Sequence, residues 1–91
     1  MKKRGVGRPL RIGIIGGMGP LAGVHLQKLI IKHTPAKKDQ DHLQMVCFTN
    51  PQIPDRTKSL KEDNGRKYIQ ALKKSIKLVE KTHPDYILIA C

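Results

Sequence analysis

A short β-branched run that ends in a cluster of glycines constrains the fold of this chain most. Residues 11–16 (RIGIIG) carry three isoleucines and are bounded by glycine, a pattern typical of a buried strand. Gly17 and Gly19 follow, and glycine permits positive φ and close backbone approach. Pro20 suits the first turn of a helix. The segment therefore predicts a strand, a tight turn and then a helix.

The rest of the chain continues this alternation. Residues 21–33 and 64–82 show the apolar spacing of a helix face, whereas residues 43–49 and 86–90 are almost continuously apolar, as buried parallel strands are. The sequence therefore predicts an α/β fold in the order β-α-β-α-β, a three-stranded parallel sheet of the doubly wound type. The expected helix faces are Ala22, Leu26, Leu29 and Ile30 in the first helix, and Ile69, Leu72, Ile76 and Val79 in the second.

Unusual residues gather where the carboxyl ends of the predicted strands meet, which is where such sheets bind ligands. They are the turn at Gly17 and Gly19, the loop 50–57 (NPQIPDRT), whose two prolines exclude regular structure, and Cys91. The turn matches the form of a dinucleotide fingerprint, but Asn50 stands where the ribose-binding acid is expected. A turn that binds a carboxylate or phosphate through backbone N–H groups, and a turn with no ligand, both fit the pattern.

Single side chains leave further alternatives open. Arg56 has the planar fork that suits a carboxylate, but it could equally pair with Asp55 or Glu62 at the surface. Cys47 lies within an apolar strand and is expected to be a small buried side chain. Cys91 at the ligand edge could act as a base or nucleophile, or be incidental. The four histidines lack metal-ligand spacing with either cysteine, so no metal site is predicted.

The chain is strongly basic, with 18 Lys and Arg against 7 Asp and Glu and a formal charge of +11. This charge favours nonspecific contact with polyanions, but aromatic residues make up only 3%, which disfavours a nucleic-acid-binding module. Residues 1–10 are expected to form a basic, disordered lead-in. No run of about 18 apolar residues exists to span a membrane, and two cysteines suit a reducing cytoplasm.

Several segments together resemble the aspartate/glutamate racemase family. Residues 12–22 (IGIIGGMGPLA) are similar to its N-terminal signature, and residues 34–42 to its next segment. Residues 50–57 are similar to its most distinctive loop, and residues 87–91 (ILIAC) to the strand that delivers its first catalytic cysteine. The resemblance covers nearly the whole chain from Arg11 onward.

The resemblance implies a cofactor-independent racemase of two similar α/β domains, commonly dimeric, that acts on a dicarboxylic amino acid in the cleft between them. Two cysteines on opposite faces of the substrate would remove and return the α-proton. Cys91 would be the first of them, and Arg56 would bind the side-chain carboxylate. The positions with implied substrate-binding roles are Gly17, Met18, Gly19, Gln52 and Arg56.

The sequence also departs from the family pattern. Ala90 stands where the family usually has proline, and the Asn-Thr-Ala-His that usually follows the cysteine is not present. We therefore expect residues 11–91 to be a truncated N-terminal lobe that is inactive alone, unless a homodimer brings two copies of Cys91 together. The alternatives are a non-catalytic remnant or binding domain for a dicarboxylic amino acid and, with less support, a basic polyanion-binding protein.

Overall fold

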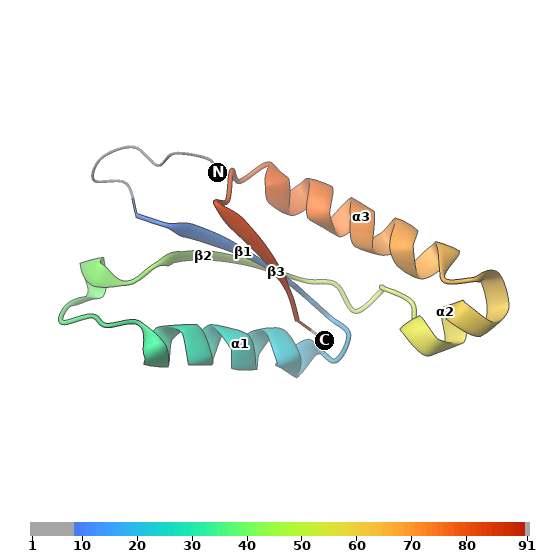
Figure 1. The fold of residues 1–91 in the computed structure, drawn as a ribbon, viewed down its shortest axis with the longest axis horizontal. Coiled ribbons are helices and arrows are strands. Elements are labelled where there is room, and N and C mark those ends of the chain that lie inside the picture. Colours follow the sequence, from blue (N-terminus) through green and yellow to red (C-terminus); the bar gives the residue numbers. More distant parts are fainter. Residues whose placement is uncertain (1–8, 91) are drawn as a thin grey trace.

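The computed structural model describes residues 9–90, which form a three-stranded parallel sheet with helices on both faces (Figure 1). The α/β fold expected from the sequence is confirmed. Residues 1–8, which make up most of the expected lead-in, and Cys91 lie outside the described residues. In chain order the elements are β1 (Arg11–Gly16), α1 (Pro20–His33), a 3₁₀ turn (Asp39–Asp41), β2 (Gln44–Thr49), α2 (Arg56–Asp63), α3 (Arg66–Glu80) and β3 (Tyr86–Ile89).

Strand β1 lies at the centre of the sheet, in the order β2-β1-β3. Its register with β2 runs from Arg11 opposite Gln44 to Gly16 opposite Thr49, and β3 pairs along its other edge. Every residue of β1 after Arg11 is buried. The apolar, β-branched composition of this strand is explained by this position, because side chains on both of its faces are covered.

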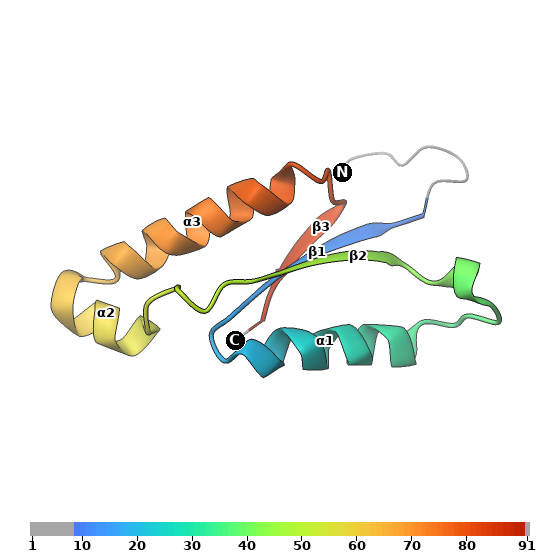
Figure 2. The same cartoon turned by 180° about the vertical axis from the view of Figure 1, so that it is seen from behind.

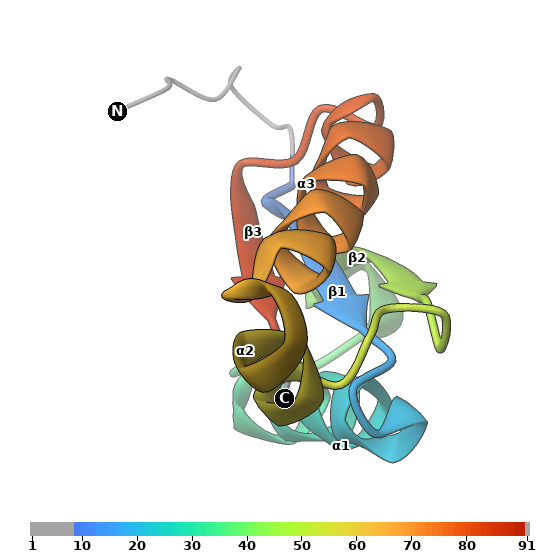
Figure 3. The ribbon, with the colours of Figure 1, turned by 90° about the vertical axis from the view of Figure 1, so that its right-hand side faces the viewer.

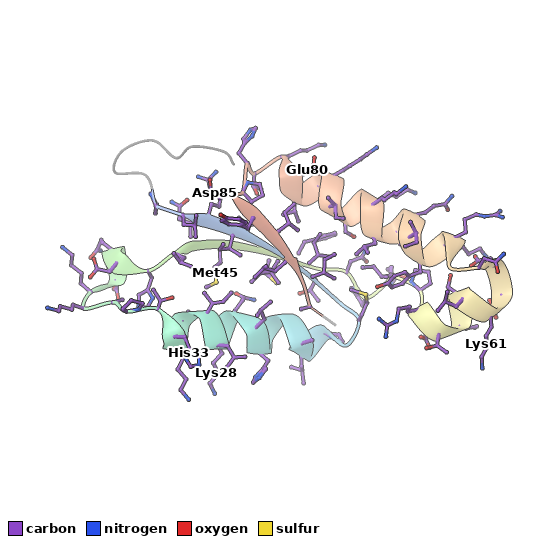
Figure 4. All side chains as sticks on the ribbon, in the orientation of Figure 1. Lys28, His33, Met45, Lys61, Glu80 and Asp85 are labelled. Atoms are coloured by element: carbon purple, nitrogen blue, oxygen red, sulfur yellow. The ribbon has the colours of Figure 1, made fainter. Side chains whose placement is uncertain are left out.

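Each face of the sheet carries its own apolar core, and Figure 3 shows α1 and α3 on opposite sides of the strands. On the α1 side, Ile12 and Ile14 form a buried cluster with Ala90. Met45 packs against this cluster, and Figure 4 shows its side chain directed from β2 toward α1. The α3 side has a second cluster, made by Ile15, Ile53, Tyr68 and Val79.

The turn before β3 is tied to the start of β1. The Arg11 guanidinium donates hydrogen bonds to the carbonyls of Thr82 (2.5 Å) and His83 (3.4 Å). The Asp85 carboxylate accepts a bond from the Arg11 backbone N–H (2.8 Å), and Figure 4 shows Asp85 beside the start of β1. Leu10, at the end of the expected lead-in, is half-buried against the α1-side core. These contacts set where β3 begins relative to β1.

The predicted second helix over residues 64–82 corresponds to α3 (Arg66–Glu80), and the structure adds before it a helix that the sequence analysis did not predict. Helix α2 begins at Arg56, inside the segment expected to be irregular, since the Asp55 carboxylate caps it by accepting from the Thr57 backbone N–H (3.0 Å). Asn64 and Gly65 both adopt left-handed backbone angles, which end α2 and start α3. Figure 2 shows α2 beyond the ends of the strands.

One position on the buried face of α3 differs from the expected one. Ile69 is 45% exposed, and the neighbouring Tyr68 is buried instead. Tyr68, Ser75 and Val79 are the buried residues of α3, with spacings of seven and four that keep them on one helical face. In α1, Leu29 is likewise exposed rather than packed. The remaining predicted positions on both helix faces are buried or half-buried.

A fall in pH should weaken the junction between α2 and α3 and so lower the stability of the fold. The Asp63 carboxylate accepts hydrogen bonds from the Ser59 hydroxyl (2.8 Å) and the Lys67 backbone N–H (3.3 Å). The Ser59 bond is the main cause that holds the pKa of Asp63 below its ordinary value of 3.8. Since the folded pKa lies below the unfolded one, ionised Asp63 stabilises the fold above the unfolded pKa. This contribution is lost as the pH falls through the folded pKa.

The comparison of wild type with Asp63→Asn by urea unfolding at about pH 6 and at about pH 3 checks this expectation. The variant should be less stable than wild type at the higher pH, and the difference should shrink at the lower pH. A stability difference that stays constant between the two pH values would contradict it.

Candidate functional site

A cavity of about 450 Å³ opens at the carboxyl ends of the strands. Three segments that are far apart in the sequence form its walls: the turn after β1, the loop after β2 together with the start of α2, and the first turn of α3 (Figure 1). The lining residues are Gly17, Met18, Gly19, Ile53, Pro54, Asp55, Arg56, Thr57 and Tyr68. The cavity thus lies at the edge where parallel α/β sheets bind ligands.

The glycine turn is fitted closely against the loop that follows β2. Gly17 has a φ of 121°, a backbone region almost confined to glycine, and a Cβ at this position would overlap the backbone of Asn50. The Asn50 backbone N–H donates to the Gly16 carbonyl (2.9 Å). Glycine is therefore required at residue 17 by this close approach. The contact brings together two walls of the cavity, the turn after β1 and the loop after β2.

Asn50 also fixes the path of its own loop. Its side-chain oxygen accepts from the Gln52 backbone N–H (3.0 Å), and its backbone carbonyl accepts from Ile53 (3.3 Å). Its side-chain NH₂ donates to Ser75 Oγ (3.3 Å), which in turn donates to the Ala71 carbonyl (3.0 Å). Ser75 is only 1% exposed, so this chain of bonds anchors the loop to the buried face of α3.

Arg56 lies on the wall of the cavity, at the first residue of α2. Across the described part of the chain, its guanidinium forms no ion pair or hydrogen bond with a protein group. The Asp55 carboxylate is instead used to cap α2. Of the two alternatives that the sequence left open, the surface pair with Asp55 or Glu62 is not formed. The guanidinium remains available to an anion in the cavity.

Of the five sequence-predicted site residues that the structure describes, four lie together and one lies apart. Gly17, Met18, Gly19 and Arg56 line the one cavity. Gln52 lies in the same loop, but it is exposed and does not line the cavity.

Cys91, the predicted catalytic residue, lies outside the described residues. Ala90, immediately before it, is buried, and its backbone N–H donates to the Ile15 carbonyl (2.8 Å) near the end of β1. The other cysteine, Cys47, is a free thiol that packs half-buried against the α1-side core and does not line the cavity.

Sequence reasoning missed several lining residues, of which Tyr68 is the most informative. Tyr68 is only 9% exposed, and its backbone N–H donates to Ser59 Oγ of α2 (3.3 Å). Two local signals could have revealed the junction between the two helices that precedes it. An Asp followed by Arg-Thr at residue 55 is typical of a helix N-cap, and Asn64-Gly65 is typical of a left-handed helix end. Together they predict a short helix that ends just before α3, whereas the position of Tyr68 follows from the docking of α3 on α2.

Among residues 9–90, no group of three or more His, Cys, Asp or Glu side chains is arranged to hold a metal ion. None of the helices that the structure describes has both the length and the apolar character needed to cross a membrane.

The fold and the cavity together define an α/β lobe with an arginine-bearing cavity at the carboxyl edge of its sheet, the edge where such sheets bind ligands. Residues 15–91 match the family model described as Asp/Glu/Hydantoin racemase, and the chain belongs to this family. The structure is similar to that of Picrophilus torridus aspartate racemase, with a TM-score of 0.76 and 39% sequence identity. That match covers 90% of this chain and 55% of the other, so this chain corresponds to little more than half of that protein. The predicted membership of the racemase family, through its N-terminal part, is confirmed.

The two glycines of the turn should respond very differently to alanine. Gly17→Ala combines a φ of 121° with overlap on the Asn50 backbone, so we expect a loss of more than about 3 kcal/mol in the free energy of unfolding. Gly19→Ala is the matched control, since its φ is 49° and a Cβ there meets nothing within 4 Å. We expect it to cost about 1–2 kcal/mol. Urea unfolding measures both, and equal losses would contradict the close approach of Gly17 to Asn50.

Proposed function

We propose that this chain forms one half of the active site of a racemase for dicarboxylic amino acids. The observation that carries the proposal is the unpaired guanidinium of Arg56 on the wall of the strand-end cavity, in a chain of the racemase family. A dicarboxylic amino acid presents a carboxylate at each end, and the planar fork of arginine can hold one of them through two parallel hydrogen bonds. The aspartate racemase to which this chain is similar supports aspartate as the first substrate to test.

The glycine turn supports the same proposal. Gly17 and Gly19 leave the backbone on the cavity wall uncovered by side chains, so that a ligand can approach it closely. The turn also leads directly into α1, whose first N–H groups favour negative charge. Arg56 and this turn lie on different walls of the cavity and would hold a substrate between them.

The proposed reaction transfers one proton on each face of the substrate. The Cys91 thiolate takes the α-proton, which leaves a planar carbanion, and an acid on the opposite face returns a proton to invert the centre. The chain contains two cysteines, and Cys47 packs on the α1 side of the sheet, away from the cavity. In this scheme the second acid is supplied by residues outside this sequence or by a second copy of the chain. No cofactor takes part in this scheme.

A reducing compartment fits this chemistry. Cys47 is a free thiol, and the proposed role of Cys91 also requires a free thiol. We therefore place the protein in the cytoplasm as part of the proposal.

Non-catalytic binding of a dicarboxylic amino acid is the second candidate function, because the same cavity and the same Arg56 support it. The two functions share a binding test and differ in the activity test.

Binding should depend on the Arg56 guanidinium. We expect the 91-residue chain to bind L-aspartate and succinate, and Arg56→Gln to weaken binding at least about tenfold by removing the bidentate partner. Arg66→Gln is the matched control, because Arg66 is an exposed arginine at the start of α3 that does not line the cavity. Titration followed by ¹⁵N chemical shifts measures both. Equal affinities in the two variants would remove Arg56 from the site.

Racemisation should require a group that one copy of this chain does not supply. We expect the pure 91-residue chain to produce no D-aspartate from L-aspartate, as measured by chiral chromatography with Cys91→Ser as the control. Turnover that disappears in Cys91→Ser and is linear in protein concentration would contradict the need for an outside acid. A rate that rises with the square of the concentration would identify a second copy as its source.

A further inference from the structure

We propose that the Tyr68 hydroxyl is a specificity-determining group of the cavity and donates a hydrogen bond to the same carboxylate that Arg56 binds. This inference rests on the function proposed above and extends it to a residue on a different helix. Tyr68 lies in the first turn of α3 and Arg56 in the first turn of α2, and both line the cavity.

The two residues are held on the same side of the cavity by a fixed connection. The Tyr68 backbone N–H donates to Ser59 Oγ (3.3 Å), and Ser59 lies three residues after Arg56, on the adjacent turn of α2. Ser59 is buried and also donates to the Asp63 carboxylate (2.8 Å). The start of α3 is thus docked on α2, and this contact fixes the position of Tyr68 relative to the helix that carries Arg56.

The environment of the ring leaves the hydroxyl without a protein partner. Tyr68 is 9% exposed and packs in the α3-side core with Ile15, Ile53 and Val79, whose side chains cannot form hydrogen bonds. In the region from 9 to 90, no hydrogen bond of the Tyr68 hydroxyl is found. A tyrosine buried to this degree usually has a partner for its O–H.

The missing partner is explained if the hydroxyl faces the cavity. In the described part of the chain, Nδ1 of His42 is the one fully enclosed side-chain nitrogen or oxygen that has no hydrogen-bond partner. The Tyr68 hydroxyl also has no partner, so it is not fully enclosed and keeps some access to open space. The open space that Tyr68 lines is the cavity. A neutral O–H donor beside a guanidinium is well matched to a carboxylate, which accepts from both. A purely structural core position would be filled equally well by phenylalanine.

The variant Tyr68→Phe removes only the oxygen and keeps the ring in the core. We expect its melting temperature to equal that of wild type or exceed it, and its affinity for L-aspartate to fall about tenfold, the usual effect of losing a hydrogen bond to a charged group. Affinity for L-alanine, which has no side-chain carboxylate, should not change. Tyr86→Phe is the matched control, because Tyr86 lies on β3 and does not line the cavity.

Each outcome decides between the two proposals. If Tyr68→Phe binds L-aspartate as tightly as wild type while Arg56→Gln does not, the role of Tyr68 is wrong and the proposed function stands. If wild type does not bind L-aspartate at millimolar concentration, both fail. A second measurement needs no variant of the site: with ¹³Cζ-labelled tyrosine, the signal of Tyr68 should move on addition of L-aspartate, and that of Tyr86 should not. An unmoved Tyr68 signal under saturating ligand would overturn the inference.

Discussion

The central place of β1 is the constraint on which the other elements depend. Its alternate residues serve different layers, since Ile12 and Ile14 contribute to the α1-side core and Ile15 to the α3-side core. A shift of its register by one residue would exchange these layers, so the strand can pair in one way only. Arg11 at its beginning fixes the turn before β3, and Gly17 just after its end fixes the loop after β2. Both neighbouring strands are therefore positioned by this one strand.

The cavity and the core on the α3 side are parts of one packed unit. Ile53 and Tyr68 belong to that core and also line the cavity, and the Asn50 side chain joins the loop to the buried Ser75. Ligand-binding groups on such a support lose little freedom when a ligand binds, because packing has already ordered them. The same arrangement means that a change in the core on this side also changes the shape of the cavity, whereas no described residue of the α1-side core lines it.

The sequence was sufficient for the features that depend on local pattern. The strand at residues 11–16, the glycine turn and the parallel order follow from apolar runs and glycine positions. Helix α2 was missed because it has no apolar face to detect: its one large apolar residue, Leu60, is exposed, and only its end signals identify it. The choice between Tyr68 and Ile69 as the buried residue could not be made from periodicity, since both fit a helical stripe. The docking of α3 on α2 decides it, through a contact that no local pattern contains.

Strand β3 has a consequence for the behaviour of the protein in solution. It lies at an edge of the sheet, and Tyr86, Leu88 and Ile89 are exposed along it. Edges of this kind favour sheet-to-sheet association between molecules. The formal charge of +11 opposes such encounters through long-range repulsion, which falls within about 10 Å at 0.1 M salt and within about 3 Å at 1 M. We therefore expect association of molecules through β3 to increase with salt concentration and to be weakest in dilute salt.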